Sequence, residues 1–194
     1  MKKCTLFLLI IISLGFVFQS CKKGDNDPFL SLRSRMARIT GVWELTSGTK
    51  YFTEDDSSNT VNYDGINAYS LVDTFPYTLK WTIEKEGTFV LNAHNSGVVF
   101  TYKGLWSFGH KIKEIDLKNK ESIIFRYTYY NVVYNGGTGN YTETYSGYDC
   151  PVDEFRIDQL KNKELIVITE GSTQLPDFTQ SSSGSITFTK EKKK

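Results

Sequence analysis

The sequence predicts an all-β protein, an antiparallel up-and-down β-barrel preceded by a short N-terminal helix. After Trp43 the apolar residues recur at every second position, which is the period of a half-buried strand. The segments are short, closely spaced and bounded by turn residues, and no long helical pattern separates them. Counting them gives about eight to eleven strands, an arrangement typical of an antiparallel barrel or sandwich.

The N-terminus predicts an export signal. Lys2 and Lys3 precede an apolar run from Leu6 to Phe18. That run is shorter than the roughly 20 apolar residues that a bilayer-spanning helix needs, and it has the proportions of a signal peptide. We therefore expect residues 1–20 to be removed on export.

The cleavage site favours a lipoprotein. Ordinary signal peptidase needs small residues one and three positions before the cut, and Phe18 is too large for the second of these places. Phe18-Gln19-Ser20-Cys21 resembles the bacterial lipobox, although the common motif has Leu first and a small residue second. The resemblance implies acylation of Cys21 and a tether over residues 21–27. Each buried methylene contributes about 0.8 kcal/mol, so two or three acyl chains would hold the protein on a membrane.

Cysteine usage and charge exclude several classes. The chain has 3 cysteines, and removal of Cys4 and acylation of Cys21 would leave Cys150 without an internal disulfide partner. We expect Cys150 to be a small buried residue near a turn, with a nucleophile as the alternative. The formal charge of +1 includes Lys2 and Lys3, so the exported chain is close to neutral and no basic stripe indicates a nucleic-acid partner.

A helix is expected at the start of a single domain that spans residues 28–194. Asp27 is a favourable N-cap and Pro28 suits the first helical position. An apolar stripe follows at helical spacing, formed by Phe29, Leu32, Met36 and Ile39. We expect this helix to plug one end of the β-structure, with a membrane-facing basic helix as the alternative.

The strands follow in order from Gly41. The apolar sets that share one face are Trp43 and Leu45; Tyr77, Leu79, Trp81 and Ile83; Phe89, Leu91 and Ala93; Phe100, Tyr102, Gly104, Trp106 and Phe108; Ile123, Phe125, Tyr127 and Tyr129; Phe155 and Ile157; Leu165 and Val167; Ile186 and Phe188.

Turns and loops separate these sets. Gly87 supplies positive φ in one hairpin. Segments 117–121 and 160–164 are nearly identical, and we interpret them as two hairpins with Asn at the left-handed position, with an internal repeat as the alternative. Loops are expected at 54–59, 136–140 and 180–184.

Gly41-Val42-Trp43 resembles the Gly-x-Trp signature of lipocalins, and the wider layout is similar to lipocalin-like lipoproteins of Gram-negative outer membranes. The resemblance implies a barrel whose base is closed by Gly41 and Trp43 and whose ligand enters at the other end. Two departures are visible. The Thr-Asp-Tyr motif is missing, and no late-strand Arg is available to stack on Trp43, so Arg33, Arg38 or Lys190 must substitute.

No residue pattern indicates catalysis. His94 and His110 are the only histidines, and neither has ligand spacing or a Cys or Glu partner. No phosphate-binding Gly loop and no Ser nucleophile elbow is present. We therefore expect a non-enzymatic protein without metal or cofactor.

The tyrosines give the candidate binding residues. Tyrosine joins a flat apolar ring to a polar tip, which suits cavities and glycan or protein recognition, although it is also a common strand residue. Strand parity points Tyr127 and Tyr129 into the barrel and Tyr130 outward, and we add Trp81 and Trp106 as candidate ligand contacts.

The expected function follows from this layout. It is an outer-membrane lipoprotein, on the periplasmic or surface face, that binds a small apolar ligand. The alternative is a surface interaction or adhesion module for envelope proteins or glycans, without an internal ligand.

Overall fold

The computed structural model describes residues 34–54, 57–110, 121–134, 139–175 and 178–192. The expected signal peptide (1–20), the lipidation site Cys21, the tether (21–27) and the helix start at Asp27 and Pro28 lie outside these ranges. So do most of the expected loop at 136–140 and the turn of the hairpin at 117–121.

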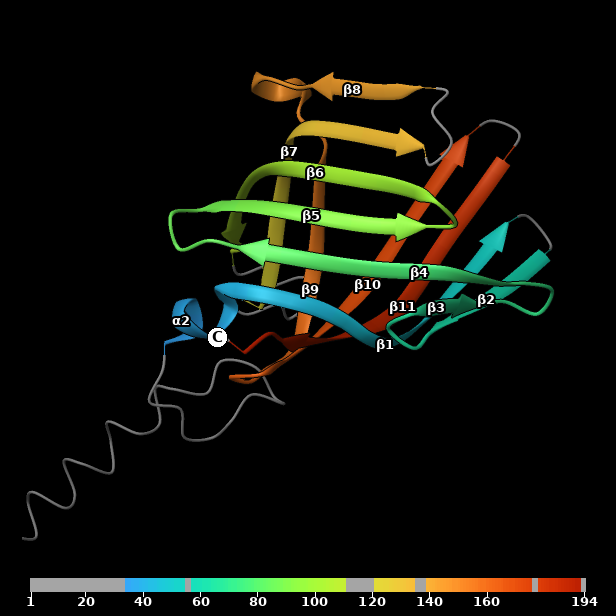
Figure 1. Cartoon of the computed structure of the whole chain (residues 1–194), viewed down its shortest axis with the longest axis horizontal. Helices are drawn as coiled ribbons and strands as arrows, with labels where there is room; N and C mark the ends of the chain where they lie inside the picture. The colour runs from blue at the N-terminus through green and yellow to red at the C-terminus, as the bar shows by residue number, and fades with distance from the viewer. Residues whose placement is uncertain (1–33, 55–56, 111–120, 135–138, 176–177, 193–194) are drawn as a thin grey trace, which may run out of the picture.

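The expected helix is confirmed only in part: α2 (Arg35–Ile39) lies at one end of the barrel (Figure 1), but it begins at Arg35, because Ser34 before it has an extended backbone. Met36, expected on the apolar stripe, is 38% exposed. The Ser34 side chain caps it by accepting a hydrogen bond from the Ala37 amide at 3.2 Å. Arg38 Nη1 donates to the Leu160 carbonyl at 2.6 Å, and the Ile39 side chain is fully buried. In the described ranges no helix is long and apolar enough to cross a membrane.

After α2 the described chain forms eleven strands and one short 3-10 helix, η3 (Gly147–Asp149), and ten of the strands close into an antiparallel β-barrel. They are β1 (Gly41–Glu54), β2 (Ser57–Tyr63), β3 (Asn67–Tyr69), β4 (Thr74–Ile83), β5 (Thr88–Asn95), β6 (Val98–Phe108), β7 (Ser122–Tyr134), β8 (Asn140–Thr144), β9 (Val152–Leu160), β10 (Glu164–Leu175) and β11 (Phe178–Lys190). The pairing order is β6-β5-β4-β3-β2-β1-β11-β10-β9-β7, and a β6–β7 pairing closes the ring. Of the two architectures that the sequence left open, the barrel is confirmed.

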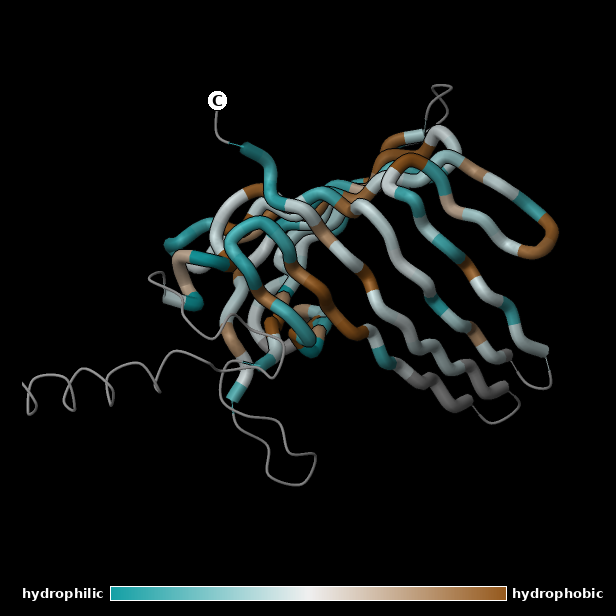
Figure 2. Tube along the Cα trace, turned by 90° about the horizontal axis from the view of Figure 1, so that it is seen from below, coloured by the Kyte–Doolittle hydropathy of each residue, from teal (hydrophilic) through white to brown (hydrophobic). Residues whose placement is uncertain are grey.

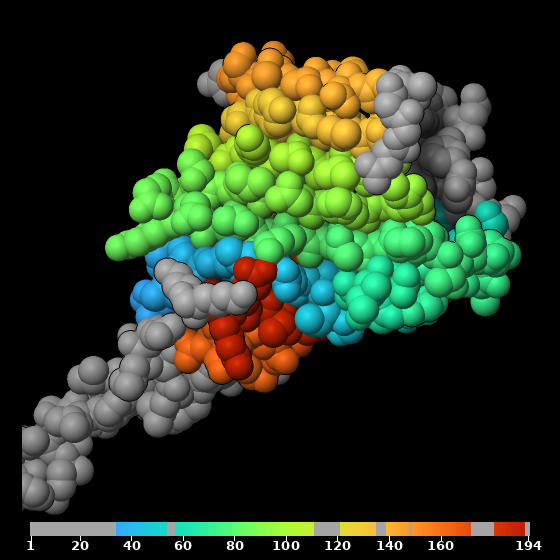
Figure 3. Space-filling model, viewed as in Figure 1, coloured from blue at the N-terminus to red at the C-terminus, as the bar shows by residue number. Residues whose placement is uncertain are grey.

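The two halves of the barrel differ in their strand pairing. Next to α2, residues Gly41–Glu44 of β1 pair directly with β4, and β9 joins β7 to β10. Farther along, β2 and β3 lie between β1 and β4, β8 pairs with β7, and among the described residues no pairing links β8 to β10. We call this second part the wide half, and the part next to α2 the packed half. β8 adds to the outer edge of β7, and Figure 3 shows it at the margin of a face on which β4 to β8 lie in order.

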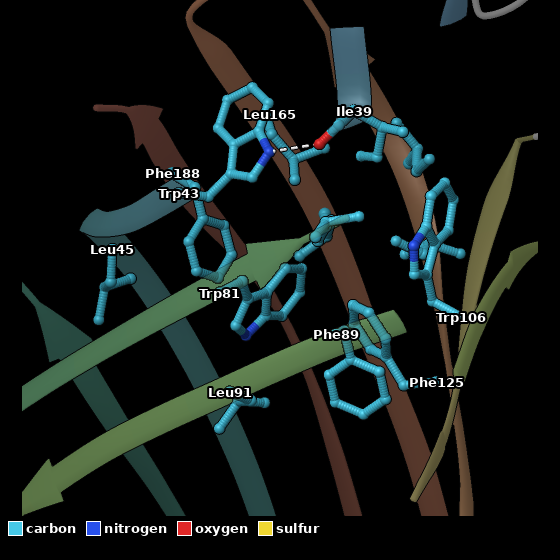
Figure 4. Close-up of a cluster of buried hydrophobic side chains, with 14 of the residues drawn as sticks. Ile39, Trp43, Leu45, Trp81, Phe89, Leu91, Trp106, Phe125, Leu165 and Phe188 are labelled. Atoms are coloured by element: carbon cyan, nitrogen blue, oxygen red, sulfur yellow. Dashed lines mark hydrogen bonds between the residues drawn. The ribbon is translucent and has the colours of Figure 1, made fainter. Parts of the chain in front are cut away.

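Large apolar side chains fill the packed half, as Figure 4 shows. The ring centroid of Trp81 lies 4.2 Å from Phe188, 5.0 Å from Phe125 and 5.3 Å from Phe155. Figure 2 shows hydrophobic and hydrophilic residues interleaved along the strands, as expected when one face of each strand is buried. This half is therefore a solid core with no space reserved for a ligand.

Trp43 closes the packed half between the first strand, the last strand and α2. Its indole Nε1 donates to the Ile39 carbonyl at 2.6 Å (Figure 4). The Lys190 ammonium lies 4.9 Å from the Trp43 ring centroid and donates to the Arg38 carbonyl at 2.7 Å. Lys190, one of the three residues expected to substitute for a late-strand Arg, therefore stacks on Trp43, and Arg33 lies outside the described residues.

Gly41 is needed for this arrangement. Its φ is 133°, and a Cβ at this position would lie 2.3 Å from Lys190 Cε. Glycine alone adopts this backbone conformation without strain and leaves room for the lysine side chain to reach across. The short Gly-x-Trp pattern thus has a physical basis in the closure of the sheet.

Three expectations about loops and turns are wrong. In the expected loop at 54–59, Glu54 ends β1 and residues 57–59 belong to β2, which pairs with β1. Residues 180–184, expected to be a loop, belong to β11 and pair with β1 and β10, because three adjacent strands continue the sheet there. Ser96, with φ of 48°, is the one described non-glycine residue with positive φ, so Asn162 does not take the left-handed position. Gly87 does have the expected positive φ, at 90°.

We predict that Gly41→Ala destabilises the barrel. Strained backbone and contact with Lys190 should lower the free energy of unfolding by about 1–3 kcal/mol, measured by urea denaturation with tryptophan fluorescence. Gly171→Ala is the control, because its Cβ would meet its nearest atom at an ordinary 3.6 Å. Equal effects of the two substitutions would contradict the proposed role of Gly41.

Candidate functional site

A β-bulge in the β6–β7 pair decides which tyrosines face the interior. The register shifts between Lys103 and Gly104, so β7 contributes an extra residue between Tyr127 and Tyr129. Gly104 allows the close approach, since a Cβ there would lie 2.0 Å from the Arg126 carbonyl oxygen. Every β7 side chain beyond the bulge consequently changes face.

The expected orientations of Tyr129 and Tyr130 are therefore wrong. Tyr130 faces inward and stacks on Tyr102, with ring centroids 4.7 Å apart. Tyr129 lies on the outer face, where the Lys103 ammonium is 5.0 Å from its ring centroid. Tyr127, which precedes the bulge, faces inward as expected.

The two candidate tryptophans belong to the packed half. Trp81 is 2% exposed and Trp106 is 6% exposed, and both are members of the hydrophobic core. Trp106 Nε1 donates to the Glu84 carbonyl at 2.7 Å. The structure therefore does not bring Trp81 and Trp106 together with the accessible tyrosines.

Five inward-facing tyrosines from four strands line the wide half in two groups of contacting rings. We call the two groups together the tyrosine wall, which consists of Tyr63 and Tyr77 in one group and Tyr102, Tyr127 and Tyr130 in the other. The ring centroids of Tyr63 and Tyr77 are 5.1 Å apart, and those of Tyr102 and Tyr127 are 5.3 Å apart. All except the buried Tyr127 are half-buried, so their rings are partly accessible to solvent.

Asp153 places a carboxylate beside this wall. It pairs with Phe125 in the β7–β9 register and so shares the inner face with that core residue. Tyr127 Oη donates to Asp153 Oδ2 at 2.6 Å. Asp153 is nevertheless exposed, which shows that water reaches the inner face at this level.

Lys50 contributes a cation from the opposite side of the ring. It is two residues beyond Gly48, which pairs with the core-packed Ile186, so Lys50 faces inward too. Burial lowers the pKa of the Lys50 ammonium, and the negative charge of Asp153 opposes that shift. The Lys50 Nζ atom lies 4.8 Å from the ring centroid of Phe52.

Burial favours the neutral form of four phenols. It raises the pKa of Tyr63, and it raises the pKa of Tyr77 to about 12, with a smaller contribution from Tyr63. Burial also raises the pKa of Tyr102, and for Tyr127 the hydrogen bond to Asp153 adds to the effect of burial on the pKa. These four side chains therefore present neutral rings and hydroxyl groups over the physiological pH range.

This arrangement suits binding better than catalysis. Aromatic faces pack against apolar or ring-shaped ligands, while hydroxyl and charged groups fix orientation. In the described part of the chain, no group of three or more His, Cys, Asp or Glu side chains is placed to hold a metal ion. Cys150 is 7% exposed and a free thiol, which confirms the expected buried cysteine.

Sequence reasoning missed Lys50 and Asp153. Parity counted from Trp43 and Leu45 places Thr49 and Tyr51 inward, but a register shift between Leu45 and Ser47 reverses the later part of β1. Asp153 has the parity of Phe155 and Ile157, so alternation from these two residues indicates its inward face, but it is polar and precedes the apolar set of that strand.

Comparison with protein-family models, with curated proteins and with solved structures gives no match for this chain. Its fold and its site therefore have to be argued from its own residues.

We predict that the buried phenols make the protein less stable at alkaline pH. The pKa of Tyr77 is about 12 in the folded chain against 10.0 for an ordinary tyrosine, so the unfolded chain binds fewer protons above about pH 10. Stability should fall between about pH 10 and 12, with Tyr77 accounting for about 2 kcal/mol. Urea denaturation at several pH values measures the decline.

Tyr77→Phe should make that decline shallower, because it removes one buried phenol. Tyr51→Phe, at a residue that is 54% exposed, is the matched control and should leave the decline unchanged. An identical pH dependence for the wild type and Tyr77→Phe would contradict this description of the wall.

Proposed function

We propose that this protein is a non-enzymatic, lipocalin-like binding protein that holds a small amphipathic molecule against the tyrosine wall. The observation that carries the proposal is the wall itself, two groups of contacting tyrosine rings on the inner face, of which all but Tyr127 are partly accessible to solvent. Aromatic surface that stays exposed to water is not buried by the protein itself, and a bound ligand can bury it.

The packed half limits where the ligand lies. Trp43, Trp81 and Phe125 already fill the barrel next to α2, so the ligand occupies the wide half. A ligand that buries about 200 Å² of apolar surface there would gain roughly 5 kcal/mol before the costs of binding are subtracted. The phenol hydroxyls favour an amphipathic ligand over a purely apolar one.

The proposed location is the cell envelope, with acyl chains on Cys21 as the anchor. The support is the similarity of Phe18-Gln19-Ser20-Cys21 to a lipobox. Mass spectrometry of the mature protein should find diacylglycerol on an N-terminal Cys21, and Cys21→Ser should release the protein from membranes. An unmodified Cys21 would refute the proposed anchor.

A second function, a surface interaction module for envelope proteins or glycans, has one observation in its favour. Tyr134 and Tyr141 are each 50% exposed at the rim formed by β7 and β8. Tyrosines of this kind are frequent in recognition surfaces. If this is the function, the double substitution of Tyr134 and Tyr141 by Ala abolishes capture of partners from envelope extracts or glycan arrays.

We predict that the folded protein binds the neutral fluorescent probe N-phenylnaphthylamine at one site, with the inner tyrosines as contacts. Tyr130→Ala should weaken binding about tenfold, since loss of an aromatic contact in a site of this kind costs about 1–2 kcal/mol. Fluorescence titration measures the affinity, and the thermal transition confirms that each variant is folded.

Tyr129→Ala is the matched control, because Tyr129 is the neighbouring residue on the outer face. It should leave the affinity unchanged. Absence of probe binding by the folded wild type, or equal loss in the two variants, would refute a ligand site on the inner wall.

A further inference from the structure

The Lys50 ammonium faces the barrel interior without an ion-pair partner among the described residues. Within the described residues, its ammonium has a contact with the Phe52 ring and no carboxylate at ion-pair distance. The side chain is half-buried on the inner face, where the loss of hydration disfavours its charge. A cation in this position is stabilised by an anion that approaches from the interior.

Thr169 places a second polar group at the same level of the barrel, and its hydroxyl lacks a hydrogen-bond partner in the described part of the chain. Thr169 is 7% exposed. Lys50 and Thr169 each pair with Gly184, from the two sides of β11. Gly184 has no side chain, so no side chain of β11 separates the two groups.

The carboxylates near the wall are already stabilised by water or by hydrogen bonds and do not need a cation from a ligand. Asp153 is exposed to water and accepts the hydrogen bond from Tyr127. Glu143, farther along on β8, accepts a hydrogen bond from Tyr145, and hydrogen bonds from tyrosines lower its pKa, which stabilises the carboxylate. Asp153 supplies a negative charge that acts on Lys50, but among the described residues no carboxylate lies at ion-pair distance from the ammonium. The complementary ligand group is therefore negative.

We propose that the ligand is an amphipathic organic monoanion, whose charged group lies between Lys50 and Thr169 and whose apolar body lies against the tyrosine wall. One ammonium and one hydroxyl match a single negative charge better than a dianion such as a phosphate monoester. This inference rests on the proposed function, since it assigns the chemical class of the ligand at the same site.

Two probes that differ by one charged group test the inference. Anilinonaphthalenesulfonate has the scaffold of N-phenylnaphthylamine with an added sulfonate. The folded wild type should bind the sulfonate probe more tightly than the neutral one, and added salt should reduce this preference. Lys50→Met, which keeps an unbranched apolar chain, should weaken sulfonate binding about tenfold and leave neutral binding unchanged.

Lys103→Met is the matched control. Lys103 lies 5.0 Å from the Tyr129 ring on the outer face, much as Lys50 lies 4.8 Å from Phe52 on the inner face. Its substitution should change neither affinity. Thr169→Val, which removes a hydroxyl at constant shape, should weaken sulfonate binding about threefold and spare the neutral probe.

The outcomes separate this inference from the proposed function. If neutral binding persists while Lys50→Met leaves sulfonate affinity unchanged, the site exists and the anion pairing is refuted. The same conclusion follows if Lys50→Met and Lys103→Met weaken sulfonate binding equally. If neither probe binds the folded wild type, the proposed function fails as well.

Discussion

The contact on which the fold depends is the closure of the sheet at Trp43. The indole hydrogen bond to Ile39 ties the first strand to α2, and the Lys190 ammonium ties the last strand to both. These contacts join residues from the two ends of the domain, so they form when the sheet has returned to its first strand. They fix one end of the barrel, and the positions of the inward-facing side chains along the barrel axis are counted from that end.

Along the barrel axis, the side chains that face inward differ between the end next to α2 and the wide half. Trp81, Phe125 and Phe188 fill the first levels at the close packing usual in protein interiors. Beyond them β2 and β3 enter between β1 and β4, and the inward positions include the tyrosines of the wall, Lys50 and apolar residues such as Phe100 and Val132. Gly48 and Gly184 contribute no side chain there. The proposed recognition therefore lies at one end of the barrel and the packed core at the other.

The sequence predicts much of this fold and less of the site. The period of two gives the strands and their faces near Trp81, Phe89 and Ile123, because a side chain in a regular strand has one of two directions. The period of two no longer predicts the faces after a bulge, because one extra residue reverses the face of every residue that follows it in the strand. For this reason the sequence pattern places Tyr129 and Tyr130 on the faces opposite to those in the structure. Bulges arise from contacts between strands, such as the approach of Gly104 to Arg126, and a single strand's pattern does not record them.

The central claim is that the interior consists of a packed half and a tyrosine wall accessible to ligands. Aromatic NMR spectra of tyrosine-labelled protein, recorded with increasing N-phenylnaphthylamine, test it most directly. The account predicts that the ring signals of Tyr77, Tyr102 and Tyr130 shift together while those of Tyr129 stay fixed. Shifts confined to Tyr129 and other outer-face rings would contradict it.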